Sequence, residues 1–318
     1  MPSKSKIHKL SHIDLTESMD VETAAKVIFR GCALHLKENF RQFKDEGDPM
    51  ALMQIRIGVR RMRVALYIFR PIIPKETRSK FNREYRYFGN LLGDARNMDV
   101  FLDSTLMPEI KTKDFKKVSK ELLMLGEEFR AEEYDIIIHE ISGGHFERLS
   151  KSFDKWLQGN WATKLGRSAR KIMSSPVASF ALNAIEEGGI ELMNRGADVE
   201  NLSANELHDL RKYIKRSRYH LRFFSSLIRK EKIDEGYDLL VQMQDYLGHI
   251  NDVKEGMIIL SQLSAAIRAD YFAETLRFNA RVYGDASKEV EQNLQDFLIL
   301  WRKFEDFSVD KKDLRNAA

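Results

Sequence analysis

The 318-residue chain is poor in the residues that cross-link or interrupt a fold, with one cysteine, six prolines and 17 glycines. The single Cys32 excludes an internal disulfide, and no Cys/His cluster has the spacing of a zinc site, so the sequence favours a cytosolic setting. So few prolines and glycines favour long helices over a β-sandwich, whose frequent turns need these residues. The sequence therefore predicts an all-α protein.

Long apolar runs are also missing. No apolar stretch approaches the ~18 residues that a membrane-spanning helix needs. The first 17 residues are basic and polar, without the apolar core of a secretory signal. Hydrophobic residues make up 43% of the chain and charged residues 31%, which is ordinary for a globular protein. We therefore expect a soluble, cytoplasmic protein that does not enter a membrane.

Acidic residues are absent from two stretches that are rich in cations. Residues 53–70 hold five basic residues and residues 210–230 hold eight, and neither stretch contains Asp or Glu. Because the whole chain has a net charge of only +4, the remainder is on balance acidic. Solvated helical faces usually mix Lys and Arg with Glu at spacings of three and four residues. The pattern therefore indicates a localised anion-binding site rather than a generally basic surface.

Two motifs recur at one spacing in the two halves of the chain. Residues 52–63 align without a gap on residues 207–218, an offset of 155 residues. Residues 91–100 align on residues 246–255 at the same offset. An internal duplication of this kind predicts two similar units, each too small to close its core alone, packed about a pseudo-twofold axis.

Apolar residues at helical spacing predict four helices in each unit. After a basic polar segment at residues 1–17, we expect the first unit at residues 18–140, a helical connector at residues 141–176 and the second unit at residues 177–318. The expected helices lie near residues 18–46, 49–70, 75–106, 114–140, 177–196, 204–231, 235–263 and 268–308, with two more in the connector. The predicted fold is thus a pair of four-helix bundles.

Each basic helix is expected to carry its cations in a stripe beside an apolar seam. The stripes consist of Arg56, Arg60 and Arg63 in the first unit and Arg211, Lys215 and Arg218 in the second. With its flanking turns each stripe spans roughly 20 Å, which suits an extended anion better than one phosphate. A planar guanidinium can bind two phosphate oxygens and stays charged when partly desolvated, so these stripes favour phosphate. We expect both stripes to line one cleft.

The same motifs make the sequence resemble the CHAD family, an α-helical domain named for its conserved histidines. The strongest matches are LLGDARNMDV at residues 91–100, LHDLRKYIKRSRY at residues 207–219 and MQDYLGHIND at residues 243–252. Their order and spacing follow the family pattern along nearly the whole chain. Two positions depart from it: Met53 replaces the first family histidine, and Asn97 replaces the usual acidic residue.

The resemblance implies a stand-alone, non-catalytic member of the family that binds inorganic polyphosphate in a basic cleft, often at polyphosphate granules. Together with the stripes it assigns a set of polyphosphate-binding residues. They are Arg56, Arg60, Arg61, Arg63, Arg96, His208, Arg211, Lys215, Arg216, Arg218 and Arg222. It implies neither a metal nor a cofactor. His208 matches the second family histidine, so the Met53 departure predicts weaker binding by the first half.

Two other interpretations remain open on the sequence. The cations could form structural ion pairs with acidic residues of neighbouring helices, for instance Asp94, Asp99, Asp245 or Asp252. The basic helices could instead grip the backbone of RNA or DNA, with nearby tyrosines stacking on bases. These tyrosines are Tyr67, Tyr213 and Tyr219. Catalysis is not expected, because the sequence has no HExxH, no GxxxxGK and no nucleophile elbow.

Overall fold

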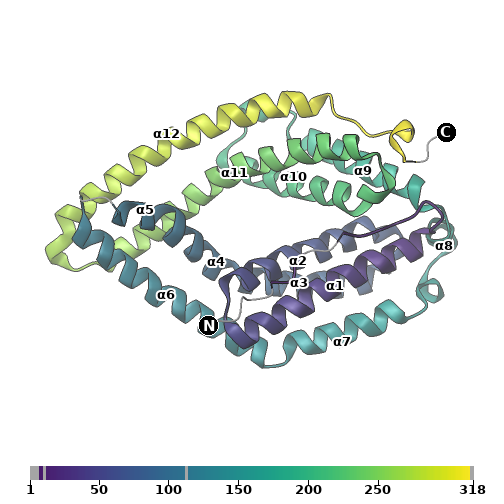
Figure 1. Ribbon diagram of the computed structural model, residues 1–318, viewed down its shortest axis with the longest axis horizontal. Helices are drawn as coiled ribbons and strands as arrows, with labels where there is room; N and C mark the ends of the chain where they lie inside the picture. The colour runs from purple at the N-terminus through teal and green to yellow at the C-terminus, as the bar shows by residue number, and fades with distance from the viewer. Residues whose placement is uncertain (1–6, 10–11, 112–113, 316–318) are drawn as a thin grey trace.

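The computed structural model of the protein describes residues 7–9, 12–111 and 114–315, and long α-helices occupy most of them (Figure 1). In these ranges the only β-type pairing is two isolated bridges. The predicted all-α class is therefore confirmed. Parts of the expected N-terminal segment (residues 1–6 and 10–11) and the end of the expected second unit (residues 316–318) lie outside the described residues.

The helices of the first half and of the connector follow the expected order. They are α1 (Val21–Glu46), α2 (Pro49–Ile68), α3 (Lys75–Leu91), α4 (Gly93–Val100), a π-helical turn (Phe101–Leu106), α5 (Met107–Ile110), α6 (Lys116–Ser142), α7 (His145–Gln158) and α8 (Arg167–Met173). The second half contains α9 (Val177–Arg195), α10 (Ala204–Phe224), α11 (Lys230–Ala265) and α12 (Phe272–Glu305). None of the helices in the described part of the chain has both the length and the apolar character needed to cross a membrane.

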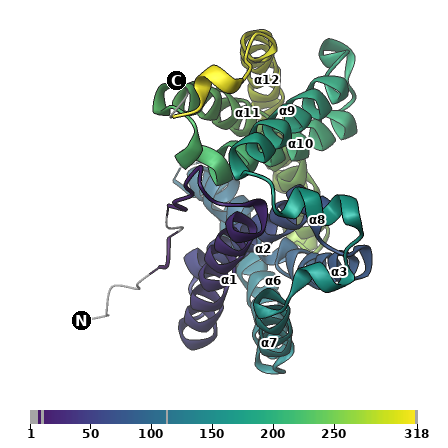
Figure 2. The same ribbon diagram turned by 90° about the vertical axis from the view of Figure 1, so that its right-hand side faces the viewer.

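The helices form two groups that meet along α2 and α10. One group contains α9 to α12, and the other contains α1, α2, α3 and α7 (Figures 1 and 2). At the far end, α4 packs on α11 and α6 packs on α12, which links the groups a second time. The two basic helices therefore lie next to each other, although they are distant in sequence. The pseudo-twofold duplication and the unit boundaries remain predictions.

Two expected helices are shorter than predicted. The helix expected at residues 75–106 breaks at Leu92, whose backbone departs from helical geometry (φ −86°, ψ 6°) and whose carbonyl accepts a hydrogen bond from the Arg56 guanidinium. The helix expected at residues 204–231 ends at Phe224. The chain beyond it leaves the helix because Ile228 pairs with Leu314 near the C-terminus. Both breaks come from contacts with distant residues, which local periodicity cannot report.

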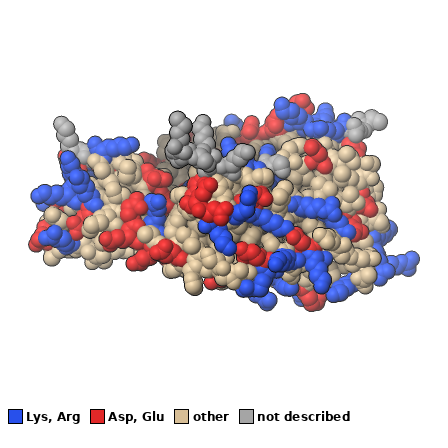
Figure 3. Space-filling model, turned by 60° about the horizontal axis from the view of Figure 1, so that its bottom comes forward, with Lys and Arg blue, Asp and Glu red and all other residues tan. Residues whose placement is uncertain are grey.

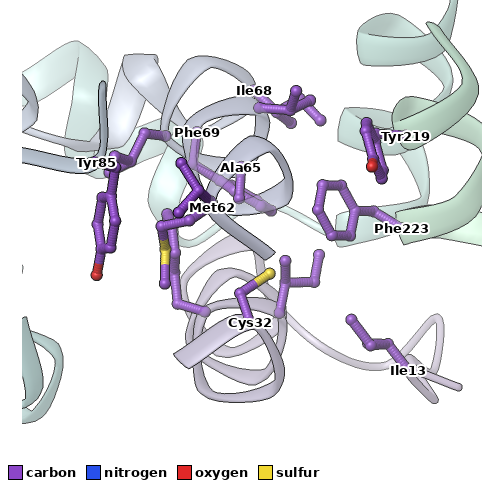
Figure 4. Packing of buried hydrophobic residues seen from close by; sticks show 14 of the residues in the cluster. Ile13, Cys32, Met62, Ala65, Ile68, Phe69, Tyr85, Tyr219 and Phe223 are labelled. Atoms are coloured by element: carbon purple, nitrogen blue, oxygen red, sulfur yellow. The ribbon is translucent and has the colours of Figure 1, made fainter. Parts of the chain in front are cut away.

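One apolar core runs through both halves. Cys32 of α1 lies among Met62, Ala65 and other buried residues, and Phe223 of α10 reaches the same cluster (Figure 4). Further along, the ring centre of Phe69, just after α2, lies 6.3 Å from that of Phe224 in α10. Burial raises the pKa of the Cys32 thiol to about 11, so this side chain is an inert apolar group at neutral pH. Neither half closes its own core.

Helix α9 approaches α10 closely at Gly188. The Nδ1–H of the buried His220 on α10 donates to the carbonyl of Ala184 at 2.8 Å, one turn before the glycine. A Cβ at Gly188 would lie only 2.3 Å from that nitrogen. Burial lowers the pKa of His220 to about 4, so the imidazole is neutral and serves to join the two helices.

Candidate functional site

A cleft of about 1000 Å³ lies between α2 and α4 on one side and α10 and α11 on the other. Eight Lys and Arg residues line it: Arg56, Arg60, Arg63, Arg96, Arg211, Lys212, Lys215 and Arg216. Only three carboxylates do so: Asp94, Asp252 and Glu255. Because low-dielectric walls surround an excess of one charge, the cleft concentrates positive potential.

The structure brings eight of the eleven predicted residues together at this cleft. They are Arg56, Arg60, Arg63, Arg96, His208, Arg211, Lys215 and Arg216. The α2 stripe faces the cleft over its whole predicted length. The α10 stripe faces it from His208 to Lys215. The two basic helices therefore face one cleft, as the sequence predicts, and whether these residues contact polyphosphate stays a prediction.

The other three predicted residues lie away from the cleft. Arg61 is only 2% exposed, and its guanidinium packs 5.3 Å from the centre of the Phe223 ring. Arg218 and Arg222 both lie over the ring of Tyr237 on α11, at 5.8 and 5.7 Å. Arg218 and Arg222 do not line the cleft because α10 faces it through Lys212 and Arg216. From Lys215 a helical stripe can continue to either side, and the sequence does not say which.

Several polar residues of the site were missed by the sequence reasoning. Asn82 of α3 accepts a hydrogen bond from Arg63 Nε at 3.1 Å. Asn251 and Glu255 of α11 also line the cleft, and Asn251 is hydrogen-bonded to the His208 ring. The 155-residue offset could have found Asn251, because it places this residue opposite the predicted Arg96; Glu255 lies opposite Val100, which the sequence did not single out. Asn82 carries no such signal.

Glycines make room for the deepest guanidinium groups. A Cβ at Gly248 of α11 would lie 3.0 Å from Arg211 Nη2, and one at Gly93 of α4 would lie 3.8 Å from Arg56 Nη1. Burial, followed by neighbouring arginines, lowers the pKa of Arg56 to about 10. Burial also lowers the pKa of Arg211. Both guanidinium groups still carry their charge at neutral pH, although they have lost much of their water.

Lys215 occupies the most unfavourable position for a cation in the cleft. It is 8% exposed, and burial together with the charges of Arg60 and Arg211 lowers its pKa to about 6. Burial also lowers the pKa of His208, against the opposing hydrogen bond with Asn251. Both groups are therefore largely neutral at pH 7 when the cleft holds no anion. A bound polyanion would favour their protonated forms.

Structural ion pairs do not account for the basic stretches. Among the described residues, nine of their thirteen cations form no ion pair with a carboxylate. Of the acids suggested as partners, Asp99 pairs with Arg130 of α6 at 3.5 Å, outside the two stretches. The other three, Asp94, Asp245 and Asp252, form no ion pair in the part of the chain that the structure describes. Desolvated cations without partners are unfavourable, and an anion bound from outside would offset this cost.

Two of the cleft cations pair with carboxylates: Lys212 with Asp209 at 2.8 Å, and Arg216 with Glu191. Glu191 of α9 pairs with Arg216 at 2.6 Å and accepts a hydrogen bond from the Tyr67 hydroxyl at 3.0 Å. The guanidinium groups of Arg70 and Arg216 lie 4.2 and 4.3 Å from the centre of the Tyr67 ring. Tyr67 and Arg216 line the cleft, so this cluster joins α2, α9 and α10 beside it.

One outer face of the molecule differs in charge from the cleft. On the face shown in Figure 3, Lys and Arg side chains are interspersed with Asp and Glu. Mixed charge of this kind gives no strong field of one sign. In the described ranges, no group of three His, Cys, Asp or Glu residues is placed to hold a metal ion.

Comparison with known proteins gives the same fold. The crystal structure of the CHAD domain from the plant Ricinus communis is similar over 97% of this chain and 99% of its own, with a TM-score of 0.77 and 22% identity. PptA from Streptomyces chartreusis is similar over 89% of this chain and 100% of its own, with a TM-score of 0.66 and 13% identity. No curated protein matches the chain. The CHAD domain family model matches residues 27–257, well over half of the sequence, and the chain therefore belongs to the CHAD domain family.

Proposed function

We propose that the protein binds inorganic polyphosphate in this cleft, as a non-catalytic cytoplasmic protein, and that association with polyphosphate granules follows from this binding. One observation carries the proposal. Cations from two helices that are 155 residues apart in sequence line a single cleft, and most of them have no carboxylate partner among the described residues. A linear chain of phosphates presents closely spaced negative charge that can meet several of these cations at once.

Nucleic acid is the second candidate, and the tyrosines argue against it. Tyr219 is buried, and Tyr213 packs against the guanidinium groups of Arg195 and Arg216 at 4.9 and 4.6 Å. Tyr67 lines the cleft, but its ring is engaged by two guanidinium groups. The three rings are thus used in packing, whereas binding of single strands relies on aromatic faces open to bases.

The proposal is tested by comparing the affinities of the protein for long-chain polyphosphate, duplex DNA and RNA at near-physiological salt. We expect polyphosphate to bind at least about tenfold more tightly, because the cleft offers charge without base readout. We also expect the affinity to fall steeply with added salt, because several counterions are released when several cations engage one polyanion. Equal affinities would favour nucleic acid as the ligand. A flat salt response would contradict binding in the cleft.

Polyphosphate affinity should increase as the pH falls from about 8 toward 6. The pKa of Lys215 is about 6 in the free protein, and a bound polyanion would raise it, so binding takes up a proton in this range. His208, whose pKa is also lowered, should add to the effect. Titration calorimetry at several pH values should show that the affinity depends less on pH in Lys215→Arg and, to a smaller extent, in His208→Met. If the pH dependence of the affinity were unchanged in the double variant, other groups would be responsible for it.

A further inference from the structure

A second cavity, of about 490 Å³, lies in the other half of the molecule and is separate from the basic cleft. It is enclosed by α9, α10, α11, the end of α12 and the segment that follows α12. Its floor is apolar and includes the buried side chains of Leu221, Leu240 and Phe304. A volume of this size is in the range that holds small organic ligands.

The mouth of the cavity is acidic. Its charged lining residues are Glu186, Glu305 and Asp310, all exposed, and no Lys, Arg or His lines it. Asp310 pairs with Lys312 at 3.0 Å, and Glu305 accepts a hydrogen bond from Trp301 Nε1 at 3.1 Å. Glu186 forms neither an ion pair nor a hydrogen bond through its side chain with any other described residue. A ligand that matches this cavity would therefore have an apolar body and a positively charged end.

The wall formed by the C-terminal segment is firmly held. Phe307 lies against Gly236 of α11, where a Cβ would come within 2.1 Å of the ring. Beyond it, Asp313 pairs with Arg229 at 2.9 Å, and the Arg315 amide donates to the Leu227 carbonyl at 3.0 Å. The cavity is therefore formed without a ligand, and binding need not be offset by ordering of this segment.

We propose that this cavity binds a small organic cation, a primary amine carried on an aromatic or aliphatic body. The body would cover the apolar floor near Leu221 and Phe304, and the ammonium group would remain at the mouth beside Glu186. Anions of the same shape are disfavoured by the three carboxylates. The site is thus opposite in charge preference to the basic cleft, and α10 contributes to both: Ser217 and Leu221 face the cavity, and Lys215 and Arg216 face the cleft.

The test uses phenethylamine and the larger 2-(naphthyl)ethylamine as probes, with phenethyl alcohol and 3-phenylpropionate as neutral and anionic analogues. Titration calorimetry and saturation-transfer NMR on the full chain should show saturable binding of the amines. Binding of the alcohol should be at least about threefold weaker, and binding of the carboxylate weaker still, because charges at a solvated mouth act modestly. Glu186→Gln should reduce the preference for the amine over the alcohol.

A matched pair of glycine variants locates the binding site. Gly189 of α9 lines the cavity, and no atom lies within 4 Å of the position of its Cβ, so Gly189→Leu should fill the cavity without a clash and abolish amine binding. Gly284 of α12 is equally open but lines no part of the cavity, so Gly284→Leu should bind as wild type does. Amine binding that survives Gly189→Leu would overturn the proposal. So would equal binding of all analogues, or no binding of either amine.

Discussion

Charge reversal of Arg60 and Arg211 together is expected to weaken polyphosphate binding by at least about 100-fold. The two side chains face the same cleft from α2 and α10, and neither has a carboxylate partner among the described residues. Glutamate at these positions would remove two charge-assisted contacts and would add repulsion between the cleft and the phosphates. Fluorescence anisotropy or titration calorimetry with a defined polyphosphate chain length would measure the loss.

The same reversal at Arg218 and Arg222 is the matched control. These arginines lie on α10 as Arg211 does, but they face Tyr237 and not the cleft. The variant has the same change in net charge, so we expect its affinity to stay within about threefold of the wild-type value at near-physiological salt. Equal losses in the two double variants would show that overall charge, and not the cleft, governs binding. Circular dichroism should show equal helix content in both.

Gly188→Ala is expected to destabilise the protein by about 3 kcal/mol, although alanine normally favours a helix. The added methyl group would overlap the His220 ring, 2.3 Å from Nδ1. Either α9 moves away from α10, or the ring rotates and its buried Nδ1–H loses the Ala184 carbonyl as acceptor. Urea unfolding followed by circular dichroism would give the change in the free energy of unfolding.

The adjacent glycine provides the control with the opposite sign. At Gly189 no atom lies within 4 Å of the Cβ position. Gly189→Ala should therefore gain the helix propensity of alanine, up to about 1 kcal/mol, without a clash. If both variants were stabilised, the close approach of the two helices at His220 would be wrong.

Much of the fold could be predicted from the sequence because its helices are long and amphipathic. Few prolines or glycines interrupt them, so the apolar period defined most helices to within a few residues. The break at Leu92 and the end of α10 at Phe224 could not be predicted in this way. The first lies where a guanidinium from α2 contacts the backbone, and the second lies next to the pairing near the C-terminus. Both partners are far away in sequence.

The charge and the spacing of residues were enough to predict part of the site. Arg56, Arg60, Arg211 and Lys215 face the cleft as expected from the stripe on each helix. The sequence could not show on which side α10 continues the stripe, because this depends on which neighbour packs against each face. That neighbour is Tyr237 of α11, whose ring lies under the Arg218 guanidinium. The lowered pKa of Lys215 could not be predicted from the sequence either, because the burial of this side chain depends on tertiary packing.

The shared core limits how the cleft can act. Phe69 and Phe224 pack against each other where α2 and α10 meet, so the helices that carry the two stripes are joined by buried apolar contacts. Swinging them apart would expose this surface to water, at a cost of roughly 25 cal/mol for each Å². We therefore expect the cleft to keep its width and not to open by separation of α2 from α10. A chain of phosphates would bind in the cleft stepwise, a few phosphates at a time. It could also slide along its length, since every repeating unit presents the same charge to the same arginines.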